Sequence, residues 1–293
     1  MQIRGTFKKD YCLAPHTWFQ VGGNCSVFFK PIDLDDLKKF LWKNNDPVFF
    51  LGAGSNLIIR DGGIEGAVIK LQSSFFTQIV YDESLVIVGG GALDRTVSLH
   101  MAQNGIGGME FLATIPGTMG GAAAMNAGAY GREIVELIQW IELLSPQGEL
   151  YRLSASELSM TYRSGNLPSG HAITRMALKG VSSSPEKVRQ EIQRLTNIRN
   201  ETQPTQSRTG GSTFKNPPGL KAWELIDQAG CRGMTEGPVQ VSPKHCNFLI
   251  NHAQATAQQI ETLGEVVRLK VQETTGIHLD WEIIRIGKKL HNS

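Results

Sequence analysis

The sequence has few of the features that indicate a metal, a membrane or a nucleic acid. Its four cysteines (12, 25, 231 and 246) lack C-x-x-C spacing, and its seven histidines include no H-E-x-x-H, so no metal site is indicated. The formal net charge is only +2 and basic residues are dispersed, which argues against a nucleic-acid surface. We expect unpaired thiols in a reducing compartment, and therefore a cytoplasmic protein.

Long apolar runs are also missing. The one long uncharged run, residues 111–131, contains Pro116, Asn126 and five glycines, which argues against a helix that spans a membrane. The first 18 residues have no apolar core of the kind that signal peptides carry. We therefore expect no signal peptide and no membrane partner.

The common nucleotide-binding fingerprints are absent as well. GAGSNL (52–57) lacks the third glycine of a dinucleotide motif and leads into a strand, and GGGALD (89–94) has Asp94 where that glycine belongs. No GxxxxGK[ST] sequence occurs. The missing motifs therefore argue against a Rossmann domain and a P-loop. Several glycine turns at strand ends can still converge on one cofactor.

The residues that are present indicate an α+β protein with room for two domains in 293 residues. The patterns predict a strand on each side of the Gly22–Gly23 turn, with Asp33 as the N-cap of the next helix. They also predict a capping box at Ser154 and Glu157 that opens a short helix, and a helix end at Gly276. Further strands are expected at 48–51, 57–60, 67–71, 85–88, 135–145, 149–153, 172–180 and within 239–251, and helices at 34–44, 94–104, from 185 onward, at 220–229 and at 256–274.

Two C-terminal segments stand out. Residues 200–219 are polar and without periodicity, and a loop of this length in a compact domain is usually functional or disordered. The segment 277–287 alternates Leu279, Trp281 and Ile283 to one side, which places Glu282 on the opposite face.

The stretch Gly108–Gly131 contains six glycines and six alanines, and no charge after Glu110. Glycine this dense is costly unless the backbone must turn sharply or approach another group closely. The pattern leaves two interpretations open: a tightly packed segment of the core, or a main-chain cradle for a bulky cofactor.

Three polar residues are candidates for chemistry. Arg163 lies at the mouth of a loop, Ser212 lies within GGSTFKNP, and Glu282 interrupts an apolar strand. On pattern alone, a surface arginine, a turn serine and an edge-strand carboxylate are each more common than a catalytic residue. Nothing in their spacing shows that they meet.

Six motifs together resemble the UDP-N-acetylenolpyruvoylglucosamine reductase family, in its shorter class without the extra substrate-domain insertion. The resemblance extends in order from about residue 16 to residue 287. The motifs are GAGSN (52–56), GMEFLATIPGTMGGAAAMNAGAYG (108–131), YRS (162–164), GGSTFKNP (210–217), VSPKHCNFLIN (241–251) and LDWEIIRIG (279–287).

The resemblance implies a non-covalently bound FAD in a flavin-binding domain of the vanillyl-alcohol oxidase type, with a smaller α/β substrate domain. It implies reduction of the enolpyruvyl ether of UDP-N-acetylglucosamine to the lactyl ether of UDP-N-acetylmuramate, for peptidoglycan synthesis. NADPH reduces the flavin, which then delivers hydride to the β-carbon of the enol ether. We expect a monomer.

The resemblance also implies roles for individual residues. Arg163 would orient the enolpyruvyl carboxylate, Glu282 would stabilise charge that develops there, and Ser212 would give a proton to the α-carbon. The expected FAD contacts are Gly52, Ala53, Gly54, Ser55, Asn56, Leu57, Thr114, Ile115, Pro116, Gly117, Gly120, Gly121, Asn126, Ala127 and Ile173. The expected substrate contacts are Tyr162, Lys215, Asn216 and His245.

By this resemblance, residues 1–71 and 72–181 would form the two parts of the FAD-binding region. Residues 182–278 would form the UDP-sugar domain, and 279–293 a strand that returns to the active site. One departure is visible, because the family often has serine where this chain has Gly165. A flavin oxidase acting on another alcohol or sugar, and a nucleotide-sugar binding protein without catalysis, are the competing hypotheses.

Overall fold

The computed structural model describes residues 2–82 and 85–290, which divide into two compact units. Within the described residues, the first unit comprises 2–9, 27–53 and 66–198. The second comprises 10–26, 54–65 and 199–290. Each unit is therefore built from segments that are far apart in the sequence.

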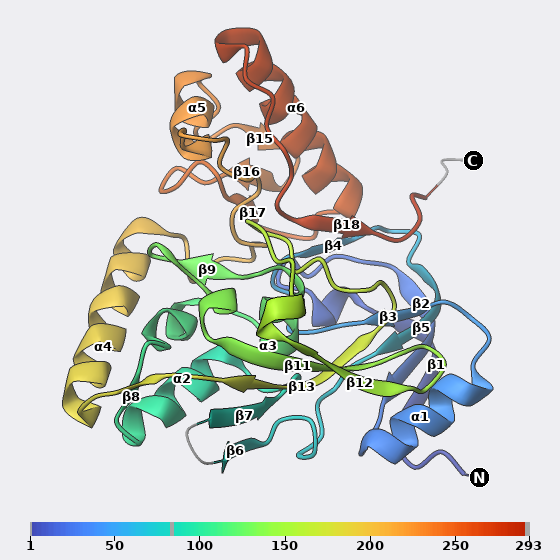
Figure 1. Ribbon diagram of the computed structural model, residues 1–293. Coiled ribbons are helices and arrows are strands. Elements are labelled where there is room, and N and C mark those ends of the chain that lie inside the picture. The colour runs from blue at the N-terminus through green and yellow to red at the C-terminus, as the bar shows by residue number, and fades with distance from the viewer. Residues whose placement is uncertain (1, 83–84, 291–293) are drawn as a thin grey trace. The chain divides into compact units, whose positions relative to one another are not determined.

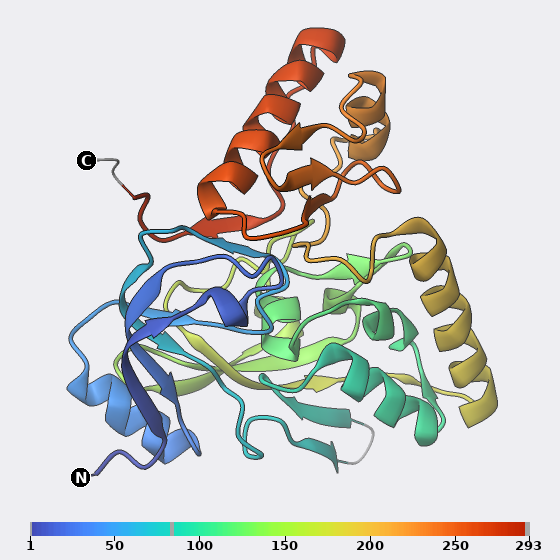
Figure 2. The same cartoon turned by 180° about the vertical axis from the view of Figure 1, so that it is seen from behind.

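Most of a sheet of order β1-β2-β5-β3 belongs to the first unit. Its strands are Thr6–Cys12, Asn24–Lys30, Ile64–Ile69 and Val48–Phe50. Helix α1 (Leu34–Lys43) lies beside this sheet as the light-blue helix in Figure 2. Its Leu37 and Phe40 belong to the same buried cluster as Phe29 of β2, and the Phe29 and Phe40 rings stack at 4.4 Å. The predicted helix and its N-cap are confirmed, because the Asp33 side chain accepts a hydrogen bond from the Asp36 N–H.

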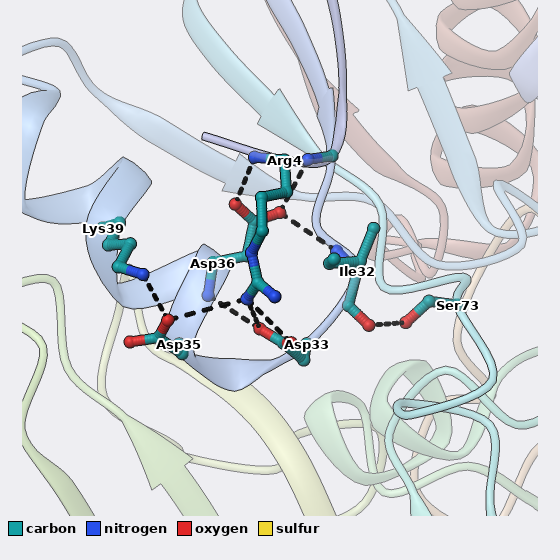
Figure 3. Close-up of polar contacts among 8 residues, drawn as sticks. Arg4, Ile32, Asp33, Asp35, Asp36, Lys39 and Ser73 are labelled. Atoms are coloured by element: carbon teal, nitrogen blue, oxygen red, sulfur yellow. Dashed lines mark hydrogen bonds and ion pairs between the residues drawn. The ribbon is translucent and has the colours of Figure 1, made fainter. Parts of the chain in front are cut away.

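A buried carboxylate fastens the N-terminal segment to α1 (Figure 3). The Asp36 side chain is fully buried and accepts hydrogen bonds from the N–H groups of Arg4, Gly5 and Ile32 at 2.8, 2.9 and 3.1 Å. The Arg4 guanidinium pairs with Asp33 at 2.7 Å. Buried backbone N–H groups need such partners, so Asp36 fixes the path of the chain into β1.

The second sheet of this unit is antiparallel, in the order β12-β11-β13-β7-β6. Its strands are Leu150–Ser154, Ile138–Leu144, Ala172–Leu178, Leu85–Gly89 and Ile79–Asp82. Helix α2 (Asp94–Gln103), the turn η2 (Glu110–Thr114) and the short helix α3 (Met119–Ala124) bury Val97, Leu112 and Met119 in one core with this sheet. Figure 1 shows α4 (Pro185–Thr202) beside this unit, where Val188 and Ile192 contact Ala102 and Ala113.

Several short elements complete the first unit. β8 (Ile106–Gly107) pairs with β14 (Val181–Ser182), and β9 (Gly128–Ala129) pairs with β10 (Arg132–Glu133). Single turns of 3-10 helix follow at η3 (Ile134–Glu136) and η4 (Ala155–Glu157). The predicted capping box at Ser154 and Glu157 is confirmed, although the helix that it opens is only η4.

The second unit has a three-stranded antiparallel sheet, β15 (Thr235–Glu236), β16 (Val239–Val241) and β17 (Leu249–Asn251). Helices α5 (Ala222–Gln228) and α6 (Ala257–Thr275) lie beside it (Figure 1). β4 (Leu57–Ile59) pairs in parallel with β18 (Ile284–Ile286), and η1 (Ala14–His16) is a short turn. Helix α6 ends at Gly276, whose φ of 72° is the left-handed cap that the sequence predicted.

The α+β prediction is confirmed, but some elements differ from expectation. The strand predicted before Gly22 is wrong, because residues 17–21 form a turn in which Thr17 Oγ1 donates to the Val21 carbonyl and accepts from the Val21 N–H. Helix α4 continues to Thr202, so the polar segment from 200 begins inside a helix. The last strand is only Ile284–Ile286, because residues 280–283 bond to a different segment.

Asp94 at the start of α2 is buried without a hydrogen bond to either carboxyl oxygen among the described residues. It packs against Gly117, where an added Cβ would collide with Oδ2. Burial in these surroundings raises the pKa of Asp94 well above its ordinary value. The native protein therefore keeps this proton at a pH where the unfolded chain has lost it.

This proton makes stability depend on pH. Because its pKa is raised, protonated Asp94 contributes to the free energy of unfolding. This contribution is fully present below the ordinary pKa of aspartate and is lost as the pH rises through the pKa of Asp94 in the native protein. Asp94→Asn removes that dependence, so its unfolding free energy relative to wild type should rise with pH, by at most about 1.4 kcal/mol per pH unit. Urea unfolding of both proteins from pH 4 to 8 measures this. A constant difference would show that Asp94 binds its proton no more tightly in the native protein than in the unfolded chain.

Candidate active site

A cavity of about 590 Å³ lies within the first unit. Its walls come from the region of β3, the end of β5, the Gly90–Gly91 turn, α3 and the start of β13. No aspartate or glutamate among the described residues lines it. The lining residues are Val48, Phe49, Phe50, Leu51, Gly52, Ala53, Ile69, Lys70, Leu71, Gln72, Thr77, Gly90, Gly91, Leu93, Thr118, Gly120, Gly121, Ala124, Ser169, Gly170, His171 and Ile173.

Two glycine turns meet at this cavity, as the sequence allowed. Gly52–Ala53 and Gly90–Gly91 both line it. A Cβ at Gly90 or Gly91 would collide with the carbonyl oxygens of Ile173 and Leu71, and a Cβ at Gly52 would lie 2.8 Å from Thr118 Oγ1. These glycines therefore let backbone segments approach one another and leave open space beside them.

Five of the predicted FAD contacts line the cavity, namely Gly52, Ala53, Gly120, Gly121 and Ile173. Gly54, Ser55, Asn56 and Leu57 belong to the second unit, because the division falls after Ala53. Thr114, Ile115, Pro116, Gly117, Asn126 and Ala127 belong to the first unit but do not line the cavity. The sequence missed Lys70, Gln72, Thr77 and His171, which follow ordinary strands or loops and carry no motif.

The Asn126 side chain is used within the protein. Its Nδ2 donates to Glu133 Oε2 at 2.8 Å and to the Thr161 carbonyl at 3.1 Å, and its Oδ1 accepts from the Val135 N–H. The residue is fully buried and has a φ of 47°. Asn126 therefore holds the central glycine-rich segment in shape, and any contact to FAD would come from its main chain.

Tyr162 and Arg163 form the tip of a tight hairpin. Thr161 and Ser164 exchange two backbone hydrogen bonds, at 2.9 and 3.0 Å. Arg163 has a φ of 55°, the left-handed region that residues with a Cβ rarely adopt, and its guanidinium lies 4.8 Å from the centre of the Tyr162 ring. Such strain is retained where the surrounding structure or the function requires it.

This hairpin is attached to the central segment 108–131. Asn126 bonds to the Thr161 carbonyl, Arg163 Nη2 donates to the Gly128 carbonyl at 3.1 Å, and the Gly165 N–H donates to the Ala124 carbonyl at 3.0 Å. The structure therefore brings Arg163 to the segment 108–131, a contact that the spacing of these residues in the sequence could not show.

Gly165 also explains the departure from the family pattern. A Cβ there would collide with the Ala123 carbonyl and lie 2.7 Å from the Ala124 carbonyl, so no side chain fits. The neighbouring Ser164 hydroxyl donates to Asn166 Oδ1 at 2.7 Å. Ser164 is thus engaged locally.

In the second unit, three segments lie side by side around Ser212. Thr213 donates its N–H to the Asn247 carbonyl at 2.7 Å, and its carbonyl accepts from the Glu282 N–H at 2.8 Å. The Lys215 N–H donates to the Asp280 carbonyl. Ser212 and Glu282, 70 positions apart in the chain, are thereby carried on adjacent segments.

Asn247 holds the Ser212 segment in place. Its Oδ1 accepts from the Phe214 N–H at 3.0 Å, and its Nδ2 donates to the Phe214 carbonyl at 2.9 Å. Asn247 is 4% exposed, so its amide is shielded from solvent and bonds to the Phe214 backbone. Asn247 lies within the motif VSPKHCNFLIN, but the sequence predicts no role for it, because an asparagine that pairs with distant backbone has no local pattern.

The two glycines before Ser212 have separate physical reasons. A Cβ at Gly210 would collide with the Phe19 ring and lie 3.1 Å from Ile283 Cδ1. Gly211 has open space around it but a φ of 81°, which glycine adopts without strain. Together they allow the chain to turn sharply and present Ser212, whose hydroxyl makes no hydrogen bond to the described residues.

Glu282 is fixed through its main chain. Its carbonyl accepts from Asn56 Nδ2 at 3.1 Å, and the Asn56 carbonyl accepts from the Ile284 N–H. Asn56, expected to contact FAD, therefore also positions the segment that carries Glu282.

The expected substrate contacts differ in availability. The Lys215 ammonium forms no ion pair with the described part of the chain. Asn216 Oδ1 accepts from the Ala222 N–H at 2.9 Å, where α5 begins. His245 packs edge-on against Phe248 at 4.8 Å, and burial lowers its pKa, which favours the neutral ring. Its buried Nδ1 has no partner among the described residues.

Within residues 2–82 and 85–290, no group of three or more histidine, cysteine, aspartate or glutamate side chains could hold a metal ion. No helix there combines the length and the apolar character needed to cross a bilayer.

Comparisons with known proteins agree with this geometry. A family described as FAD binding domain matches residues 29–154, and the C-terminal domain of UDP-N-acetylenolpyruvoylglucosamine reductase matches residues 203–286. The cavity fits a flavin cofactor in size, in its lack of carboxylates and in its glycine walls. The protein is therefore an FAD-dependent oxidoreductase, with an FAD-binding domain and a second, smaller domain.

The relatives identify the family. The chain is 50% identical over 289 residues to UDP-N-acetylenolpyruvoylglucosamine reductase of Gluconobacter oxydans (strain 621H), covering 98% of this chain and 94% of that protein. For the Acidiphilium cryptum (strain JF-5) enzyme the identity is 47%, with 98% and 93% covered. The crystal structure of the Thermus caldophilus reductase matches with a TM-score of 0.83 at 31% identity, over 97% of this chain and 99% of that one. This chain belongs to the UDP-N-acetylenolpyruvoylglucosamine reductase family, as its motifs predicted.

Proposed function

We propose that the protein reduces UDP-N-acetylenolpyruvoylglucosamine to UDP-N-acetylmuramate with NADPH, using Arg163, Ser212 and Glu282. The reaction adds a hydride to the β-carbon of the enol ether and a proton to the α-carbon. Bound FAD supplies the hydride chemistry, with NADPH as its reductant. The protein's own residues must then orient the pyruvyl carboxylate, stabilise its developing charge and deliver the proton.

Arg163 is proposed to bind the pyruvyl carboxylate. Its planar guanidinium can donate two parallel hydrogen bonds to a carboxylate, which an ammonium cannot do in a fixed geometry. The strained hairpin and the bond to Gly128 support this role, since both fix the arginine beside the central segment. Negative charge that develops on the carboxylate is then met by a preorganised donor.

Ser212 is proposed to give the proton to the α-carbon. The observation that carries the proposal is the pair of backbone hydrogen bonds of Thr213, which puts Ser212 beside the Glu282 segment. The Ser212 hydroxyl has no hydrogen bond to any described residue. A serine hydroxyl is a weak acid, but a carbanion-like carbon is a strong base, so a positioned hydroxyl is sufficient. Glu282 would stabilise the same developing charge through a hydrogen bond.

The UDP-sugar is proposed to bind to residues 182–278 through Lys215, Asn216 and His245, and to contact Tyr162 outside that range. The unpaired Lys215 ammonium is suited to a phosphate, and the remaining amide protons of Asn216 are suited to a sugar or base oxygen. We propose that residues 1–71 and 72–181 form the two parts of the FAD-binding region. We propose that residues 279–293 return to the active site. We also propose that the protein is a cytoplasmic monomer.

An anaerobic experiment tests this function. The purified protein should be yellow, should bleach with NADPH, and should regain its colour without oxygen when UDP-N-acetylenolpyruvoylglucosamine is added. Recovery with oxygen but not with this substrate would support an oxidase instead. Substrate binding without any recovery would indicate a nucleotide-sugar binding protein.

A further inference from the structure

Lys70 is a cation in an unusual position, at the wall of the cavity in the first unit. It directly follows β5, and its main-chain N–H donates to the Phe29 carbonyl at 3.0 Å. Its Nζ donates to the Gly52 carbonyl at 2.6 Å. The ammonium is thereby held at the Gly52–Ala53 turn.

No carboxylate balances this charge. None of the residues that line the cavity is acidic, and Lys70 forms no ion pair in the described part of the chain. Burial, and to a lesser extent the neighbouring Lys30, lowers the pKa of Lys70. A partly buried charge without a counter-ion is costly, so the surroundings favour an anion in the cavity.

The Lys70 ammonium also has N–H groups that could donate to an anion. A lysine has three N–H donors, and the Gly52 carbonyl accepts from one of them. The other titratable side chain at the cavity, His171, has its Nδ1 3.0 Å from the Ser169 carbonyl. Lys70 is therefore the better placed of the two to meet a strong anion.

We propose that Lys70 binds the diphosphate of FAD and provides the positive charge that the cavity otherwise lacks. The inference rests on FAD being the cofactor of this protein. It assigns the cavity to the phosphate-bearing part of FAD and makes Lys70 a residue that selects the dinucleotide over shorter flavins. Gly52 then has two functions, because its missing side chain opens the cavity and its carbonyl orients the ammonium.

The test is flavin binding to the full-length protein after removal of FAD, followed by fluorescence quenching with FAD, FMN and riboflavin. Lys70→Met should weaken FAD binding about 10–100-fold, because charge-assisted hydrogen bonds to phosphate are lost. FMN binding should fall less, and riboflavin binding should change less than about 3-fold. The FAD dissociation constant of the wild type should also rise more steeply with salt than that of Lys70→Met.

Three further variants separate charge from shape. Lys70→Arg keeps the charge and should retain most FAD affinity, whereas Lys70→Gln keeps a donor for the Gly52 carbonyl and should behave like Lys70→Met. Lys30→Met removes the same charge outside the cavity lining and should change FAD affinity less than about 3-fold. Thermal unfolding of each flavin-free protein checks that the fold is retained, and Lys70→Gln carries the test if Lys70→Met does not fold.

The outcomes are distinguishable. Equal losses for FAD and riboflavin would overturn the proposal, since Lys70 would then only shape the cavity. A changed NADPH dependence of flavin reduction with unchanged FAD affinity would also overturn it and assign Lys70 to the other dinucleotide. If the wild type itself binds no FAD, the proposed function fails before Lys70 is tested.

Discussion

Ser212→Ala should slow the recovery of colour by UDP-N-acetylenolpyruvoylglucosamine about 10²–10⁴-fold, the range lost when a positioned proton donor is removed. Reduction by NADPH should keep its wild-type rate, because that step needs no proton on the substrate α-carbon. Anaerobic stopped-flow absorbance separates the two half-reactions. An unchanged second half-reaction would remove Ser212 from the mechanism.

The adjacent threonine offers a matched control. Thr213 is 1% exposed and its buried hydroxyl has no hydrogen-bond partner among the described residues. Thr213→Val changes only that side chain and leaves the backbone bonds to Asn247 and Glu282 in place. Both half-reactions should therefore keep their rates, and the protein should become slightly more stable. A slow Thr213→Val variant would mean that the segment is simply sensitive to substitution.

Arg163→Lys and Arg163→Gly should each lower kcat/KM for the UDP-sugar about 10²–10³-fold, as removal of one preorganised donor to a developing oxyanion does. The lysine variant should fail almost as badly as the glycine variant, because a single ammonium does not reproduce the planar fork. Steady-state kinetics at several substrate concentrations measures both. Near-normal activity of Arg163→Lys would show that charge alone suffices.

The glycine variant also separates function from stability. Glycine adopts the φ of 55° at position 163 freely, which relieves about 1 kcal/mol of strain. The lost hydrogen bond to Gly128 costs about the same. Urea unfolding should thus place Arg163→Gly within about 1 kcal/mol of wild type. A much larger loss would indicate that Arg163 is structural, and its loss of activity would no longer report on catalysis.

Local elements could be predicted from the sequence because short-range rules decide them. The N-cap at Asp33, the capping box at Ser154 and the glycine end of α6 at Gly276 were confirmed, since each depends on residues within one helical turn. The strand expected before Gly22 failed because Thr17 bonds to Val21, a side-chain contact that competes with sheet formation.

The family, the α+β class and the candidate residues Arg163, Ser212 and Glu282 could be inferred from the sequence, because dense motifs carry them. Which residues lie together became visible in the folded chain. It placed Arg163 against the segment 108–131 through Asn126 and Gly128, and Ser212 beside Glu282 through Asn247 and Thr213. These contacts are hydrogen bonds from side chains or backbone groups to the backbone of segments far apart in the chain, and such contacts leave no periodic pattern in the sequence. The proposed role of Lys70 could likewise not be predicted from the sequence, since it depends on a cavity whose described lining residues include no acidic side chain and which only the folded chain creates.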